Sequence, residues 1–120
     1  MKLHPDLAAK CLELASASQT LPAEISERDF QAEVLRLAKR HAWLAYHTHD
    51  SRRSAKGFPD LVMVRPPQLL FAELKTNTGK LTPEQQDWLD HLNASGAVAC
   101  IWRPKDWAMI ERALSATIVG

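Results

Sequence analysis

Apolar residues recur along the chain with two periods, one typical of helices and one typical of strands. After Ser26, a residue type favoured at helix N-caps, four residues recur at helical spacing: Phe30, Val34, Leu37 and His41. They predict an amphipathic helix with one buried face. Alternating or continuous apolar runs, bounded by polar and Pro/Gly-containing segments, predict four strands, at residues 42–49, 59–65, 69–75 and 97–103.

Three further helices are expected. Thr82 as N-cap and Gly96 as terminator bound the first of them. Its expected buried residues are Trp88, Leu89 and Leu92. A helix over residues 104–116 follows the last strand, with Trp107, Ile110 and Leu114 pointing inward. A weaker pattern predicts a short helix over residues 5–18, which lies before the main run of elements. The order α-β-β-β-α-β-α from Ser26 onward predicts an α/β fold.

The strands at 59–65 and 69–75 are predicted to form a hairpin around Pro66-Pro67. If the hairpin closes symmetrically, Asp60 lies directly opposite Glu73. Like charges in that position destabilise a sheet, unless a divalent cation lies between the carboxylates. Lys75 follows Glu73 by two positions, so both side chains point to one face. Two carboxylates beside an ammonium group suit metal-assisted phosphodiester hydrolysis.

Separate explanations exist for each of these charges. Glu73 and Lys75 would form an ordinary solvated ion pair on a strand, and Asp60 after Pro59 would be a turn residue. Neither explanation accounts for Asp60 standing opposite Glu73. Among the acids of the first long helix, Glu27 adjoins the apolar stripe and Glu33 lies on the opposite flank, so Glu27 is the better candidate to join the site.

Composition narrows the class of protein. The 120 residues are 46% hydrophobic and 24% charged, which is typical of one globular domain. The two cysteines, Cys11 and Cys100, lie far apart, and the chain lacks both a signal peptide and the ~20-residue apolar run of a membrane span. A cytoplasmic location is therefore expected. Residues 36–80 carry nine basic against three acidic side chains, a net +6 in a chain of net +1, which permits a polyanionic partner.

Several motifs together resemble a known nuclease family. "PD" at residues 59–60 and "ELK" at 73–75 resemble the PD-(D/E)XK nuclease signature. The wider runs "ERDFQ" at 27–31, "HTHDSRRSAKGFPDLV" at 47–62, "FAELKTNTGKLTPEQQDWL" at 71–89 and "VACIWRP" at 98–104 resemble the VRR-NUC branch of that superfamily, particularly its stand-alone members in phages and bacteria. The "VRR" turn that gives the branch its name is not found here, but this departure does not touch the acidic motifs.

The resemblance implies a restriction-endonuclease-like αβββαβ core with a C-terminal helix, formed by residues 26–120 after an extension at 1–25. It implies Mg²⁺- or Mn²⁺-dependent DNA cleavage in a bacterial or phage-infected cell, by an enzyme similar to the Holliday-junction resolvases, which act as homodimers. The catalytic residues implied are Glu27, Asp60, Glu73, Lys75 and Gln85. The metal ligands implied are Asp60, Glu73, Glu27 and the carbonyl of Leu74.

Other polar residues are candidates for contacts to nucleic acid. They are Gln31, His47, His49, Arg52, Arg53, Lys56 and Lys80. Some have a second interpretation: Gln85 completes a capping box with Thr82, and His47 with His49 could begin a zinc site that lacks further ligands. Two other functions stay open, a non-catalytic nucleic-acid-binding module and a hydrolase or lyase acting on a small phosphorylated molecule. The second is disfavoured because the chain has no Gly-rich phosphate cradle.

Overall fold

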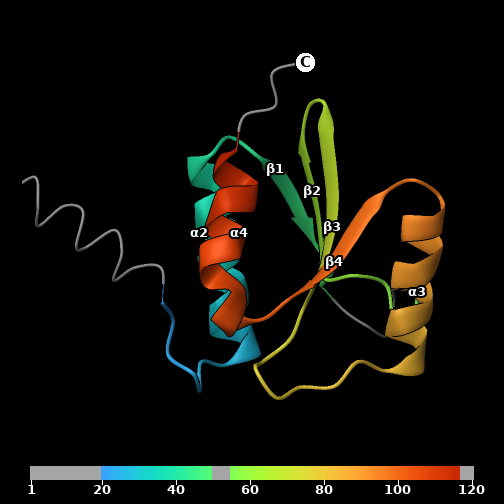
Figure 1. The fold of residues 1–120 in the computed structure, drawn as a ribbon, viewed down its shortest axis with the longest axis horizontal. Helices are drawn as coiled ribbons and strands as arrows, with labels where there is room; N and C mark the ends of the chain where they lie inside the picture. The colour runs from blue at the N-terminus through green and yellow to red at the C-terminus, as the bar shows by residue number, and fades with distance from the viewer. Residues whose placement is uncertain (1–19, 50–54, 117–120) are drawn as a thin grey trace, which may run out of the picture.

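The computed structural model describes residues 20–49 and 55–116, and its elements follow the predicted order (Figure 1). They are α2 (Glu27–Arg40), β1 (Leu44–His47), β2 (Leu61–Arg65), β3 (Gln68–Leu74), α3 (Pro83–Ala94), β4 (Val98–Trp102), the 3-10 turn η1 (Pro104–Asp106) and α4 (Trp107–Ser115). The predicted fold class, an αβββαβ core with a C-terminal helix, is confirmed. The helix expected over residues 5–18 lies outside the described residues.

The four strands form one sheet in the order β1-β2-β3-β4. The first three are antiparallel neighbours, while β3 and β4 run parallel because α3 connects them as a crossover. The hairpin has the predicted register, from Arg65 opposite Gln68 to Leu61 opposite Ala72. Strand ends differ from the prediction by one or two residues. The differences that matter for the site are that β1 stops at His47, so His49 lies beyond it, that Asp60 precedes β2, and that β3 ends at Leu74, just before Lys75.

Helices α2 and α4 cover one face of the sheet and form the core with it (Figure 1). Ser26 caps α2, its hydroxyl oxygen accepting from the Asp29 N–H at 3.0 Å. The largest fully buried apolar side chains of this core are Trp102, Phe30, Leu61, Met63, Leu74, Ile110 and Leu114. His41 was expected on the buried face of α2, but it is the C-cap residue and only half-buried, because the helix ends at Arg40.

The opposite face of the sheet is only partly covered, by α3 (Figure 1). Phe58 packs between Phe71 and Trp88, with ring centroids 6.3 and 5.0 Å away. Of the three residues expected to be buried on α3, Leu89 is buried, whereas Trp88 and Leu92 are only half-buried. The part of this face that α3 does not reach exposes the apolar side chains of Leu44, Tyr46 and Leu69. In the described ranges, no helix has the length and apolar character needed to cross a membrane.

Candidate active site

Asp60 and Glu73 meet at the open end of the β2–β3 hairpin. The register that pairs Leu61 with Ala72 brings the next residues, Asp60 and Glu73, face to face, as the sequence predicted. Asp60 stands just outside β2, and its Oδ2 accepts the Leu74 N–H at 2.8 Å. The two carboxyl groups lie close enough that the charge of Asp60 raises the pKa of Glu73. A proton on one of them, or a cation between them, would relieve the repulsion of two carboxylates at this place.

Asp60 is also held from the other side, by Thr48, the residue that follows β1. The N–H of Thr48 donates to the Asp60 carbonyl at 2.9 Å, and the Thr48 hydroxyl donates to the Pro59 carbonyl at 3.1 Å. Bonds to Thr48 and to Leu74 of β3 therefore fix the position of the Asp60 carboxylate. Thr48 was not singled out by sequence reasoning, although its place between two candidate histidines offered a signal.

Glu73 is 2% exposed and stands among apolar neighbours at the end of β3. Its Oε2 accepts from Gln85 Nε2 at 3.1 Å, while its Oε1 is buried without a hydrogen-bond partner among the described residues. Burial, followed by the neighbouring carboxyl group of Asp60, raises the pKa of Glu73 to about 8 in spite of the opposing charge of Lys75. Such a group binds either a proton or a metal cation strongly near neutral pH.

Lys75 places its ammonium beside this carboxylate. Its Nζ lies 3.7 Å from Glu73 Oε2, and its side chain is 12% exposed. The backbone N–H of Lys75 donates to the Trp102 carbonyl at 3.0 Å, which continues the pairing of β3 with β4 beyond Leu74. Leu74 itself is buried in the core and gives its N–H to Asp60. The role of its carbonyl as a metal ligand stays a prediction.

Gln85 performs both of the tasks considered for it. It forms a capping box at the start of α3, accepting the Thr82 N–H on Oε1 at 2.9 Å and donating its own N–H to the Thr82 hydroxyl at 3.1 Å. Because Oε1 is occupied by a backbone donor, the amide must direct Nε2 toward Glu73. The helix cap thus fixes the amide orientation that the Glu73 contact needs.

Glu27 lies at the edge of the group rather than within it. Its side chain is exposed on the first turn of α2. Partial burial and the charge of Asp60 raise its pKa, against the opposing charge of Lys75. In residues 20–49 and 55–116, no three or more His, Cys, Asp or Glu side chains are placed to hold one metal ion. Asp60 and Glu73 therefore form a two-carboxylate site, and metal binding by Glu27 stays a prediction.

The described candidates for nucleic-acid contacts come from α2, the end of β1, and the loops before β2 and α3. The rings of His47 and His49 are 4.1 Å apart at the end of β1. Lys56 and Lys80 are exposed, and Gln31 is half-buried on α2. Arg52 and Arg53 lie outside the described residues.

The Lys56 segment is attached to α3 by two contacts. The indole N–H of Trp88 donates to the Lys56 carbonyl at 3.2 Å. Gly57 has φ +88°, and a Cβ at this position would come within 2.5 Å of the Glu84 backbone. Only glycine fits both the conformation and the space. Sequence reasoning treated Trp88 as a core residue and overlooked Gly57, although a glycine just before "FPD" is a signal for such a close approach.

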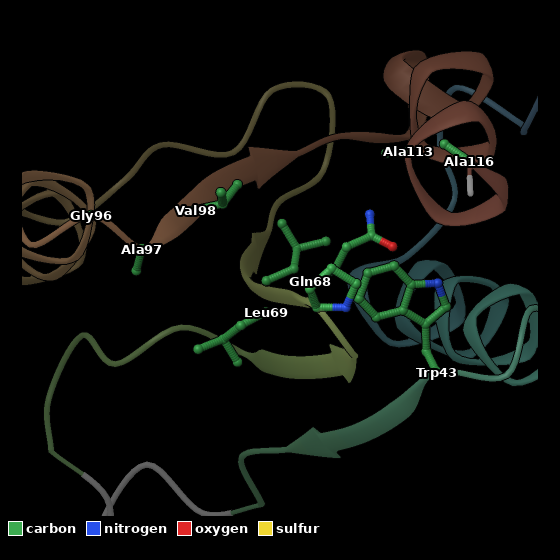
Figure 2. A pocket seen from close by; sticks show the side chains of 10 residues that line it. Trp43, Gln68, Leu69, Gly96, Ala97, Val98, Ala113 and Ala116 are labelled. Atoms are coloured by element: carbon green, nitrogen blue, oxygen red, sulfur yellow. The ribbon is translucent and has the colours of Figure 1, made fainter. Parts of the chain in front are cut away.

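An apolar hollow of about 600 Å³ lies away from the carboxylates, at the turn end of β3 (Figure 2). Its walls include Trp43, Leu69, Val98 and Ala113. None of its lining residues belongs to the group around Glu73. We place the chemistry at the carboxylates because reactive groups are found there and not in the hollow.

Comparison with known proteins decides the family. The family model of the VRR-NUC domain matches residues 5–103. The chain belongs to the VRR-NUC family. No curated protein sequence matches it.

Two solved structures support the VRR-NUC assignment at the level of the fold. They are described as a VRR_NUC domain and a VRR_NUC domain protein, each 20% identical to this chain, with TM-scores of 0.61 and 0.60. The matches cover 73% and 75% of this chain and 92% and 90% of the other chains. The Holliday junction resolvase Hjc of Archaeoglobus fulgidus is 22% identical over 66% of each chain, with a TM-score of 0.43.

The residues of this VRR-NUC site fit a hard divalent cation. Carboxylate oxygens are the ligands that Mg²⁺ and Mn²⁺ prefer, and Asp60 and Glu73 present theirs side by side. The buried Oε1 of Glu73 has no partner among the described residues, as expected of an atom whose ligand is a cation. Gln85 orients the same carboxylate from outside, a common arrangement around metal ligands.

Proposed function

We propose that this VRR-NUC protein is a Mg²⁺- or Mn²⁺-dependent DNA endonuclease that hydrolyses phosphodiester bonds. One observation carries the proposal: Glu73 is buried within reach of the Asp60 charge, retains a buried oxygen without a hydrogen-bond partner in residues 20–49 and 55–116, and has its Oε2 3.7 Å from the Lys75 ammonium. Fold stability does not account for the arrangement of Asp60, Glu73 and Lys75, because a second acid nearby raises the free-energy cost of burying the Glu73 carboxylate.

Each residue of the site has a specific task in this proposal. Asp60 and Glu73 would hold the cation, with Glu27 and the Leu74 carbonyl as further candidate ligands. The bound cation would supply Lewis-acid polarisation of the phosphodiester and lower the pKa of a water molecule. Lys75 would stabilise negative charge developing on the phosphoryl oxygens or orient the attacking water. Gln85 would keep the Glu73 carboxylate in place.

The DNA backbone would approach along the basic and polar residues around the carboxylates. These are Gln31, His47, His49, Arg52, Arg53, Lys56 and Lys80. Contacts from such side chains to phosphates position a duplex without reading its sequence. Affinity is therefore expected to fall steeply as salt rises, because binding releases counterions.

Selectivity for branched DNA and association of two copies complete the proposal. They are suggested by the resemblance of stand-alone members of the family to Holliday-junction resolvases, which work as dimers. Two associated copies would provide two sites for opposing strands. The exposed apolar side chains of Leu44, Tyr46 and Leu69 offer a surface that a second copy would cover. Light scattering checks the association, and a panel of linear, hairpin, flap and four-way-junction DNA checks the selectivity.

The central test compares cleavage by the wild type, Asp60→Asn and Lys75→Ala with Mg²⁺ or Mn²⁺. The wild type is expected to cut and both variants to lose nearly all activity. A wild type that cuts none of the substrates with either metal, or variants that cut equally well, would contradict the proposal. Salt-sensitive DNA binding without any cleavage would instead favour a non-catalytic nucleic-acid-binding module.

A further inference from the structure

Arg103 follows β4 immediately and reaches the segment that leaves the Lys75 end of β3. Its Nη1 donates to two backbone carbonyls of that segment, Thr76 at 2.6 Å and Gly79 at 2.7 Å. Bonds from a guanidinium to neutral carbonyls at such distances are strong, because the donor is charged. One side chain thus joins both ends of residues 76–79, which we call the Lys75 loop.

The Lys75 loop folds back over the lysine that precedes it. The Gly79 N–H donates to the Thr76 carbonyl at 3.3 Å, which closes a turn. A Cβ at Gly79 would lie 3.5 Å from Cδ of Lys75, so the loop lies close to the aliphatic stem of that side chain. The loop therefore restricts a long, flexible side chain whose ammonium lies 3.7 Å from Glu73 Oε2.

A second side chain attaches the same loop to its surroundings. Asn77 donates through Nδ2 to the Ala23 carbonyl at 3.2 Å, and its Oδ1 accepts the Lys105 N–H at 2.9 Å. These bonds connect the loop to the segment before α2 and to η1. They do not involve the Thr76 and Gly79 carbonyls, which Arg103 joins, so among the described side chains Arg103 is the one that holds the two ends of the loop together.

We propose that Arg103 is a positioning residue for Lys75, acting through the Lys75 loop. Arg103 keeps the loop closed, and the closed loop aims the Lys75 ammonium at the phosphodiester that the carboxylate site would hold. The proposal rests on the endonuclease function for its kinetic consequence. Its structural part, the restraint of Lys75 by Arg103, does not depend on that function.

The kinetic test uses Arg103→Gln, which shortens the side chain and loses the charge. We expect kcat to fall about 10-fold, with KM and Mn²⁺ affinity within about 2-fold of the wild type, because Asp60 and Glu73 are untouched. Arg103→Lys, which keeps the charge, should recover part of the loss. In a Lys75→Ala background, Arg103→Gln should cause no further loss of kcat, since the two residues act as one unit.

A labelling test needs no cleavage. Brief acylation followed by mass spectrometry measures how accessible the Lys75 amine is, with the exposed Lys39 of α2 as an internal reference. Arg103→Gln is expected to raise Lys75 labelling about five-fold, because the loop opens more often. Lys105→Gln removes a positive charge nearby without touching the two carbonyl bonds, so this control should change neither kcat nor Lys75 labelling.

The possible failures are distinguishable. Equal losses from Arg103→Gln with and without Lys75, or unchanged Lys75 labelling, would overturn the positioning role. A wild type that does not cleave would remove the endonuclease function, and the labelling result would still decide whether Arg103 restrains Lys75. Labelling also decides the structural part if Lys75→Ala cuts too slowly to be measured.

Discussion

The β2–β3 hairpin has an ionisable side chain at each end, Arg65 at the turn and Glu73 at the open end. The two differ in how their polar atoms are hydrogen-bonded. At the turn, the guanidinium of Arg65 donates to the carbonyls of His41 and Leu114 at 3.0 Å, to Gln68 Oε1 at 2.9 Å, and to the Ala116 carbonyl. It also lies 4.7 Å from the centroid of the Trp43 ring. At the open end, Glu73 keeps a buried oxygen without a partner among the described residues.

This difference distinguishes Arg65, whose charge stabilises the fold, from Glu73, whose charge we assign to the functional site. The bonds of Arg65 tie the hairpin turn to the ends of α2 and α4, so its burial stabilises the fold. Glu73 is buried beside another acid, which raises its pKa to about 8 and costs stability when it ionises. Residues that fit the fold poorly in this way mark functional sites. Each of the following predictions tests whether the two ends differ in this manner.

The largest expected effect is on activity, at the Glu73 end. Glu73→Gln should lower cleavage about 1,000-fold, because a neutral amide cannot hold the cation with Asp60. The free energy of unfolding at pH 8 should not fall, because a buried charge is removed. Cleavage assays and urea unfolding measure the two quantities. Glu33→Gln, the same change at an exposed acid of α2, is the control and should leave cleavage within about 2-fold.

The next effect is on stability, at the Arg65 end. Arg65→Met should lower the free energy of unfolding by about 3 kcal/mol, because several carbonyls lose their donor. Cleavage by the folded protein should be nearly unchanged. Arg36→Met is the matched control: this side chain is 65% exposed and pairs only with Glu33 among the described residues, so it should cost less than about 1 kcal/mol. A large loss of activity in folded Arg65→Met would contradict the division of roles.

The third prediction concerns pH and metal removal. The pKa of Glu73 is raised from 4.5 to about 8 in the folded protein, so the folded state binds more protons than the unfolded state between these values. The free energy of unfolding in EDTA should therefore fall as pH rises from about 5 to 8, by roughly 3 kcal/mol. Mn²⁺ should reverse the loss at pH 8. In Glu73→Gln the slope should be largely absent; an equal slope there would assign it to other groups.

The smallest expected effect separates the two tasks of Gln85. Gln85→Glu keeps the capping box but loses the donor to Glu73, so cleavage should fall about 10-fold with little change in stability. Thr82→Ala should do the reverse, costing about 1 kcal/mol of stability with cleavage by the folded protein within about 2-fold. If both variants lose stability and activity together, the cap and the carboxylate contact are not separable.

Much of the fold could be predicted because local patterns agree with it. The caps at Ser26 and Thr82, the strand alternation and the length of the Pro66-Pro67 turn determine the elements and the hairpin register. From that register, the opposition of Asp60 and Glu73 follows directly. Element ends were less certain, as at His41 and His49, because a helix or strand ends where tertiary contacts stop supporting it.

The contacts that complete the site come from residues distant in sequence. Thr48 holds Asp60 from the end of β1, Gln85 holds Glu73 from α3, and Arg103 reaches the Lys75 loop from the end of β4. No periodicity or cap rule predicts the first or the third, because each depends on how separate elements pack. The sequence by itself determined which acids face each other. The tertiary structure alone decided that Glu73 is buried with an oxygen that has no partner among the described residues, while Arg65 donates to three backbone carbonyls and a side chain, because burial and hydrogen-bond partners depend on packing between distant segments.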